Sequence, residues 1–115
     1  MPAAPITLTT STSAPSQAPS ALSLPPVALG TAIAIFGALA SGSGDCQLWR
    51  WEPKGGSDSA GAWYPYGATF AVDSAANGGK YLQRYAVDRD AAGYYHLQIP
   101  SGATSDHAFV RGAKL

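Results

Sequence analysis

Most of the chain beyond residue 30 alternates between apolar and polar positions with a period of two, the pattern of strands that bury one face. The alternation is clearest at residues 80–87 and 94–99, where Tyr95, Leu97 and Ile99 are expected to point inward. Segments rich in Gly, Asn and Asp at residues 73–79 and 88–93 separate these strands and predict turns.

Two earlier segments, residues 31–39 and 46–52, have the same period. A polar loop is predicted at residues 53–61, and further strands at residues 62–66, 68–72 and 108–110. Short strands at this spacing, without a helical stripe, predict an all-β fold, a small antiparallel β-sandwich or barrel over residues 27–115. The predicted faces are Ile33, Ile35 and Leu39 opposite Phe36 in the first segment, and Trp49 and Trp51 opposite Cys46 and Leu48 in the second.

Residues 1–26 differ from the rest and predict an extended N-terminal arm. They hold six of the nine prolines, and no Asp, Glu, Lys, Arg or His occurs before Asp45. Such a stretch has too little apolar surface to offset the entropy of ordering it, so we expect it to be mobile until a partner binds it. Two apolar pairs with period-two spacing are the predicted partner contacts: Ile6 and Leu8, then Leu22 and Leu24.

The apolar run at residues 27–40 has three possible readings. Ala38-Leu39-Ala40 resembles a signal-peptide cleavage site, which would make the chain a secreted β domain cleaved after Ala40, but a basic segment before the run is missing. The run is shorter than the roughly 20 residues that a membrane-spanning helix needs, and it contains Gly30 and Gly37. Small and β-branched residues favour a buried strand.

Little in the sequence indicates catalysis. The chain has no nucleophile-elbow, phosphate-loop or zinc-protease motif, its histidines His96 and His107 are isolated, and it has a single glutamate, Glu52. Asp88-Arg89-Asp90 is better explained as a charged turn than as a calcium loop, and the single Cys46 excludes an intramolecular disulfide. We therefore expect a protein that is not an enzyme and has no catalytic residues, cofactor or metal.

Charge constrains the partners. Seven basic residues balance seven acidic ones, which predicts no nucleic-acid binding. Charged residues make up 12% of the chain, about half the usual share, as expected of a surface covered by other protein.

Aromatic residues supply the remaining candidate site. Trp63, Tyr64 and Tyr66 surround Pro65, which marks a strand end or edge, so we expect these rings on the rim of the sandwich. Together with Trp49 and Trp51 they have three possible roles: core packing, a protein interface, or a platform on which sugars stack.

These elements together resemble the small β-sandwich proteins of tailed-bacteriophage virions, which include head decoration (cement), head-fibre and tail-associated proteins. The resemblance covers roughly residues 27–99: an apolar strand, a Gly-Ser-Gly turn, Leu48-Trp49-Arg50-Trp51, a polar loop, and Trp63-Tyr64-Pro65. Gly61-Ala62 precedes that tryptophan where the family has Asp-Gly. The uncharged arm is similar to those with which cement proteins join neighbouring capsid subunits.

The resemblance implies a structural protein of the virion, assembled in the host cytoplasm. It would bind the major capsid protein or another virion protein, as a homo-oligomer on the particle, without contacting a membrane. The alternative from a different class is a carbohydrate- or receptor-binding β module of a head fibre or tail tip, with Trp63, Tyr64 and Tyr66 as its platform.

Overall fold

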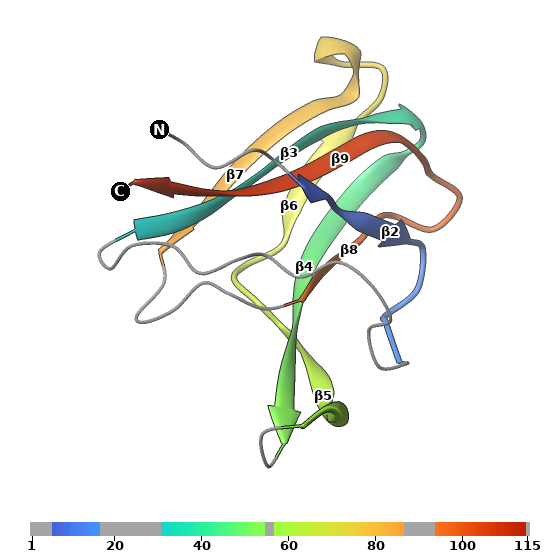
Figure 1. Ribbon diagram of the computed structural model, residues 1–115. Helices are drawn as coiled ribbons and strands as arrows, with labels where there is room; N and C mark the ends of the chain where they lie inside the picture. Colours follow the sequence, from blue (N-terminus) through green and yellow to red (C-terminus); the bar gives the residue numbers. More distant parts are fainter. Residues whose placement is uncertain (1–5, 17–30, 55–56, 87–93, 115) are drawn as a thin grey trace.

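The computed structural model describes residues 6–16, 31–54, 57–86 and 94–114. Most of these residues lie in β-strands, and the one helical element among them is the single 3₁₀ turn η1 (Asn77–Gly79). The strands form two sheets that pack face to face (Figure 1). The predicted all-β sandwich is therefore confirmed. No helix in the described part of the chain is long and apolar enough to cross a membrane.

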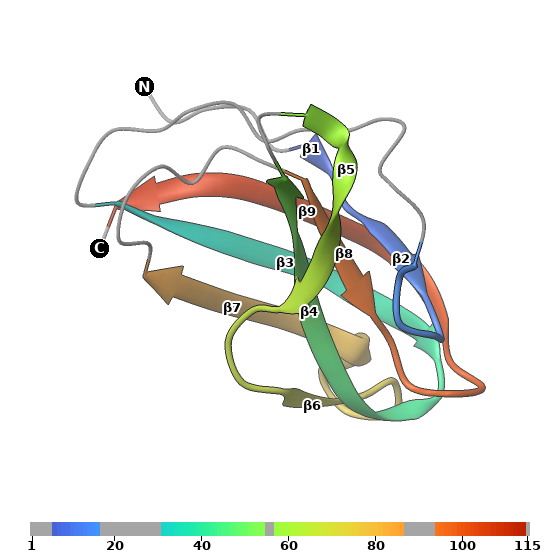
Figure 2. The same cartoon turned by 90° about the horizontal axis from the view of Figure 1, so that it is seen from below.

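The first sheet, called sheet A, is antiparallel throughout. Seen from below, its three long strands lie side by side, and the strands of the second sheet cross them obliquely (Figure 2). Its order is β1 (Ile6–Thr7), β9 (Thr104–Lys114), β3 (Thr31–Ser41) and β7 (Lys80–Ala86).

The second sheet, called sheet B, is mixed, because its first strand is parallel to its neighbour. Its order is β2 (Thr9–Ser11), β8 (Tyr95–Gln98), β4 (Ser43–Lys54) and β5 (Ser57–Pro65), with β6 (Phe70–Asp73) paired to the first residues of β4.

The core lies between the two sheets. Ile33 and Ile35 of β3 and Val110 of β9 meet Leu48 of β4 and Leu97 of β8, all of them inaccessible or nearly so. Burying each such side chain contributes about 1.5–3 kcal/mol. The inward faces predicted for residues 31–39 and 94–99 are confirmed.

Gly37 explains how β3 can be the central strand of sheet A. A Cβ atom at Gly37 would collide with the carbonyl oxygen of His107 and would lie 2.7 Å from the Tyr81 hydroxyl. The missing side chain thus allows both neighbouring strands to approach closely. The same strand runs on to Ser41, so cleavage after Ala40 would remove most of the centre of sheet A.

The N-terminal segment corrects the predicted domain boundary at residue 27. Ile6 of β1 pairs with Val110, and Thr9 of β2 pairs with His96, so the segment joins one edge of each sheet. Between them Leu8 is 2% exposed in the shared core, and its backbone N–H donates to the carbonyl of Ala108 at 2.9 Å.

Leu8 is therefore a core residue of its own chain, and its prediction as a partner contact was wrong. It fills the space between the two sheet edges. The sequence does not predict this role, because strands of two or three residues are too short to show a periodic pattern. Ile6 lies in β1 beside β9. Leu22 and Leu24, and the turn predicted at 88–93, lie outside the described residues.

Several strands are longer than the sequence predicts, among them β5 and β9. β5 begins at Ser57, inside the predicted loop 53–61, and forms a hairpin with β4. β9 spans Thr104–Lys114 and pairs with β3 along its length, although the sequence predicts a strand only at 108–110. Apart from Thr104 and His107, both extensions consist of Gly, Ser, Ala and charged residues, most of which have low strand propensity, so the pairing with a neighbour determines their conformation.

We predict that Leu8→Ala lowers the free energy of unfolding by about 2–4 kcal/mol, the usual cost of a cavity at a buried leucine. Urea unfolding of the full chain measures this cost. Thr12→Ala, at an exposed position of the same segment, is the control and should change stability by less than about 0.5 kcal/mol. Equal stability of the two variants would show that residues 6–11 do not belong to the core.

A second prediction concerns Cys46, whose side chain is inaccessible in β4. Burial, with a smaller contribution from the Asp45 carboxylate, raises the pKa of the Cys46 thiol to about 11. Because the thiolate is the reactive form, we expect a disulfide reagent at about pH 8 to label the unfolded chain in urea rapidly and the native chain very slowly. Rapid labelling of the native chain would contradict the burial of this strand.

Candidate functional site

The outer face of sheet B carries an aromatic surface, called the Trp face: Trp49 and Trp51 on β4, Trp63 on β5 and His96 on β8. Strand register brings these residues together, because Trp51 pairs with Trp63 and Trp49 pairs with His96. Cys46 and Leu48 occupy the inner face, so the tryptophans of β4 point away from the core between the sheets. Since both faces of this strand are apolar, the alternation could not show which one is inward.

The rings of the Trp face contact one another edge to face. The Trp51 and Trp63 ring centroids lie 5.5 Å apart at 68°, and those of Trp63 and His96 lie 6.1 Å apart at 61°. Such pairs contribute about 0.5–1.5 kcal/mol beyond the burial of area. Trp51 is only 4% exposed beneath its neighbours, whereas Trp49 and Trp63 are half-buried, so these last two form the accessible part of the surface.

His96 connects the N-terminal strand to this face. Its Nδ1 lies 2.7 Å from the Thr9 hydroxyl and its Nε2 lies 2.7 Å from the Ser11 hydroxyl. The Ser11 hydroxyl donates its proton to the carbonyl of Ser13 at 2.8 Å, so its oxygen accepts from His96 Nε2–H. Nδ1 then accepts from Thr9.

This arrangement differs from that of a catalytic serine and its base, in which the imidazole accepts the serine proton. Here the imidazole donates to Ser11, and a hydroxyl rather than a carboxylate bonds Nδ1. The cluster attaches β2 to β8. The sequence could not reveal it, because Thr9 and Ser11 are separated from His96 by 87 and 85 residues.

The polar atoms at the border of the Trp face form hydrogen bonds within the chain. The Trp49 indole N–H donates to the Gln98 side-chain oxygen at 3.0 Å. His96 is held by Thr9 and Ser11, and the Trp51 indole N–H has no partner in the described chain but is buried, so the accessible surface is mainly flat apolar area.

The structure separates the three rings predicted to share a rim. Trp63 lies on the Trp face, while Tyr64 is 55% exposed on the hairpin of β4 and β5, which extends beyond the rest of the sandwich (Figure 1). Tyr66 turns inward and packs against Tyr85 and Tyr95 at centroid distances of 5.8 and 6.0 Å. Trp63, Tyr64 and Tyr66 therefore do not form one platform.

Arg50 fills the open end of the core beside Tyr66. Its guanidinium lies 5.8 Å from the Tyr66 ring centroid and 5.6 Å from that of Tyr95, and its Nε is 3.6 Å from the Glu52 carboxylate. A cation over two rings stabilises the base of the hairpin, where strand register places Arg50 opposite Tyr64.

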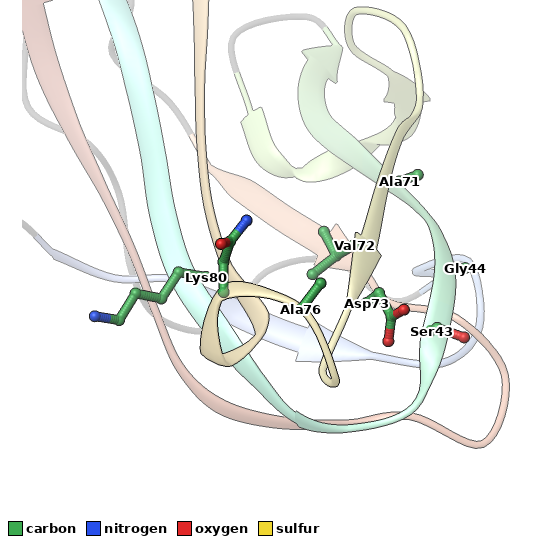
Figure 3. A pocket seen from close by; sticks show the side chains of 8 residues that line it. Ser43, Gly44, Ala71, Val72, Asp73, Ala76 and Lys80 are labelled. Atoms are coloured by element: carbon green, nitrogen blue, oxygen red, sulfur yellow. The ribbon is translucent and has the colours of Figure 1, made fainter.

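A pocket of about 360 Å³ lies at the opposite end of the sandwich, between the start of β4, β6 and η1 (Figure 3). Its lining is mostly small side chains, and the Asp73 carboxylate already accepts the backbone N–H of Ala75 at 2.9 Å. The Lys80 side chain extends away from the pocket in Figure 3. The part of the chain that the structure describes also has no cluster of three or more His, Cys, Asp or Glu side chains that could hold a metal ion. This pocket is therefore a weaker candidate than the aromatic surface.

Comparison of the chain with protein-family models, with curated proteins and with solved structures finds no match.

The environment of His96 gives a testable pH dependence. Burial lowers the pKa of the His96 imidazole below its ordinary value of 6.5. Between the pKa of His96 in the folded chain and its ordinary pKa, the unfolded chain binds more protons than the folded one. The free energy of unfolding is therefore fully present above the ordinary pKa and falls as the pH drops through the folded pKa.

We predict that the urea midpoint falls between about pH 7.5 and pH 5, and that His96→Gln reduces this fall. His107→Gln, at an exposed position, is the control and should retain it. An unchanged pH slope in His96→Gln would contradict the assigned burial.

Proposed function

We propose that this chain is a non-enzymatic structural module that attaches to a protein shell, as capsid decoration or cement proteins of tailed bacteriophages do. The observation that carries the proposal is the presence of accessible aromatic side chains on both faces of the extended hairpin of β4 and β5, Trp63 on one face and Tyr64 on the other. Tyr64 is the most exposed large apolar residue in the described part of the chain, and it lies one residue from Trp63. Tyrosine and tryptophan are the residues that most often dominate protein interfaces.

The polar groups favour a protein partner over a sugar. A sugar site combines an aromatic platform with free donors and acceptors for the hydroxyl groups. At the Trp face the Trp49 N–H and both His96 nitrogens are already bonded within the chain. The Trp51 indole N–H lacks a partner among the described residues but is buried, so the accessible area is mainly apolar, which suits a dry contact with protein.

The proposed partner is the major capsid protein or another virion protein, with several copies of this chain on each particle. Leu22 and Leu24 remain predicted contacts with that partner. Residues 17–30 contain no charged side chain, so their burial against the shell would carry little desolvation penalty. Each contact contributes modestly, and repetition over many copies accumulates stability.

We predict that Tyr64→Ala weakens attachment to assembled capsids of the same genome by about 2 kcal/mol, roughly thirtyfold, the scale of a hot-spot aromatic. Co-sedimentation over a range of concentrations measures this loss. Thr12→Ala is the control for an exposed side chain elsewhere. Because Tyr64 is exposed, the melting temperature of the free protein should change little.

Two results would overturn this proposal. One is normal co-sedimentation of the Tyr64→Ala and Trp63→Ala variants. The other is a shift of tryptophan fluorescence on addition of saccharides, with capsid binding intact, which would support the carbohydrate-binding alternative.

A further inference from the structure

Strand β7 forms an open edge of sheet A. The strand order of this sheet ends at β7, which pairs with β3 on one side and with no strand of the described chain on the other. An edge strand with unpaired backbone groups is a template for the addition of another strand. The strand spans seven residues, Lys80–Ala86, of which Ala86 already accepts the Tyr66 hydroxyl at its carbonyl, at 3.4 Å.

The outward side chains of β7 are two cations with an apolar side chain between them. Lys80 and Arg84 lie on either side of Leu82, and all three are exposed on the outer face of sheet A. Leu82 is 54% exposed, although cross-strand register places it beside Phe36, and Phe36 beside Phe109. An apolar row thus crosses the sheet and ends, uncovered, at its open edge.

Within the described residues, the cations of this face have no acidic partner. Lys80, Arg84 and Arg111 form no ion pair within the described chain, whereas Arg50 on the other sheet pairs with Glu52. Arg111 instead lies over the Phe36 ring, 5.6 Å from its centroid. Among the described carboxylates, Asp106 lies five residues before Arg111, and its Oδ2 is 3.0 Å from His107 Nδ1. Asp88, four residues after Arg84, lies outside the described residues.

We propose that β7 binds an extended segment of another protein that adds to sheet A as a further strand and reads acidic–x–apolar–x–acidic. Side chains two residues apart on the added strand would lie directly beside Lys80, Leu82 and Arg84. The two acidic residues pair with the cations, and the apolar residue extends the row of Leu82, Phe36 and Phe109. The pattern is symmetric, so it serves a parallel or an antiparallel strand.

A second copy of this chain fits the edge poorly. Antiparallel pairing of two β7 strands about Leu82 would place Lys80 opposite Arg84 twice, and like charges directly opposite are destabilising. The sequence itself contains no segment with the acidic–x–apolar–x–acidic pattern. Both observations indicate a different protein.

Single-stranded nucleic acid also fits less well. Base stacking needs open ring faces. Here the ring of Phe36 contacts both Phe109, with centroids 5.5 Å apart, and the Arg111 guanidinium. The ring centroids of His107 and Phe109 lie 5.9 Å apart. Leu82, the most accessible apolar side chain of the row, offers no stacking surface.

The test is a titration of the ¹⁵N-labelled full chain with the peptide Thr-Glu-Thr-Val-Thr-Glu-Thr, followed by amide chemical shifts. We expect the shifts to concentrate in β7 and β3, and we expect no binding of a matched peptide with Lys in place of Glu. The double variant Lys80→Glu/Arg84→Glu should bind the Glu peptide about tenfold more weakly, because two attractions become repulsions, and should bind the Lys peptide instead. Leu82→Ser should weaken binding of the Glu peptide while leaving the melting temperature nearly unchanged.

The Tyr64→Ala variant separates this inference from the proposed function. Because Tyr64 lies on sheet B, this variant should bind the Glu peptide as the wild type does. Absence of shifts in β7 at millimolar peptide would overturn the inference. So would equal binding of the Glu and Lys peptides, failure of the charge-reversed variant to prefer the Lys peptide, or stronger shifts of the same face with oligo(dT).

Discussion

The structure depends on burying one small set of apolar side chains between two sheets, and β3 supplies its centre. Ile33 and Ile35 are fully inaccessible there, and the strand pairs on both sides, with β7 and with β9. A sandwich of this size has little further apolar surface to bury, so each large side chain accounts for a substantial part of its stability. Several of the remaining large apolar residues lie outside this core, on the outer faces of the two sheets.

The N-terminal segment follows from the same constraint. A two-layer sandwich exposes its core along the sides where the sheets end, unless a side chain closes the gap. Residues 6–11 cross from sheet A to sheet B at one such side, with Leu8 directed inward and Thr9 and Ser11 bonded to His96. At the other side β7 ends sheet A without a covering strand in the described chain. The two sides thus differ, and the inferred strand-binding edge is the uncovered one.

The sequence predicts the parts of this fold in which one face is clearly more apolar than the other. Tyr95, Leu97 and Ile99 alternate with polar residues, and all three are buried as the pattern indicates. The pattern fails for β4, where Trp49 and Trp51 oppose Cys46 and Leu48 and both faces are apolar. It fails also for Leu8, because strands of two and three residues carry no period. In both cases packing against distant strands decides the outcome.

The candidate site was predictable only in part. Pro65 correctly indicates a strand end, since β5 ends at that residue, and Tyr64 is exposed as a rim position should be. Tyr66 instead packs inward against Tyr85 and Tyr95. Gly67, which follows it with a positive φ of 77°, leaves room for the Tyr85 ring, with which a Cβ atom would collide. The segregation of Lys80, Arg84 and Arg111 on one face is hidden by a net charge of zero, because net charge does not depend on where the charges lie.

Residues 6–11 pair with an edge of each sheet, and we expect this segment and both sheets to unfold as a single cooperative unit. Native-state amide hydrogen exchange of the free chain measures this directly. We expect the Leu8 amide, bonded to Ala108, and the Ile99 amide, bonded to Ser11, to exchange with opening free energies close to those of β3. Fast exchange of Leu8 and Ile99 beside a protected β3 would contradict it and would restore residues 1–26 as an arm separate from the fold.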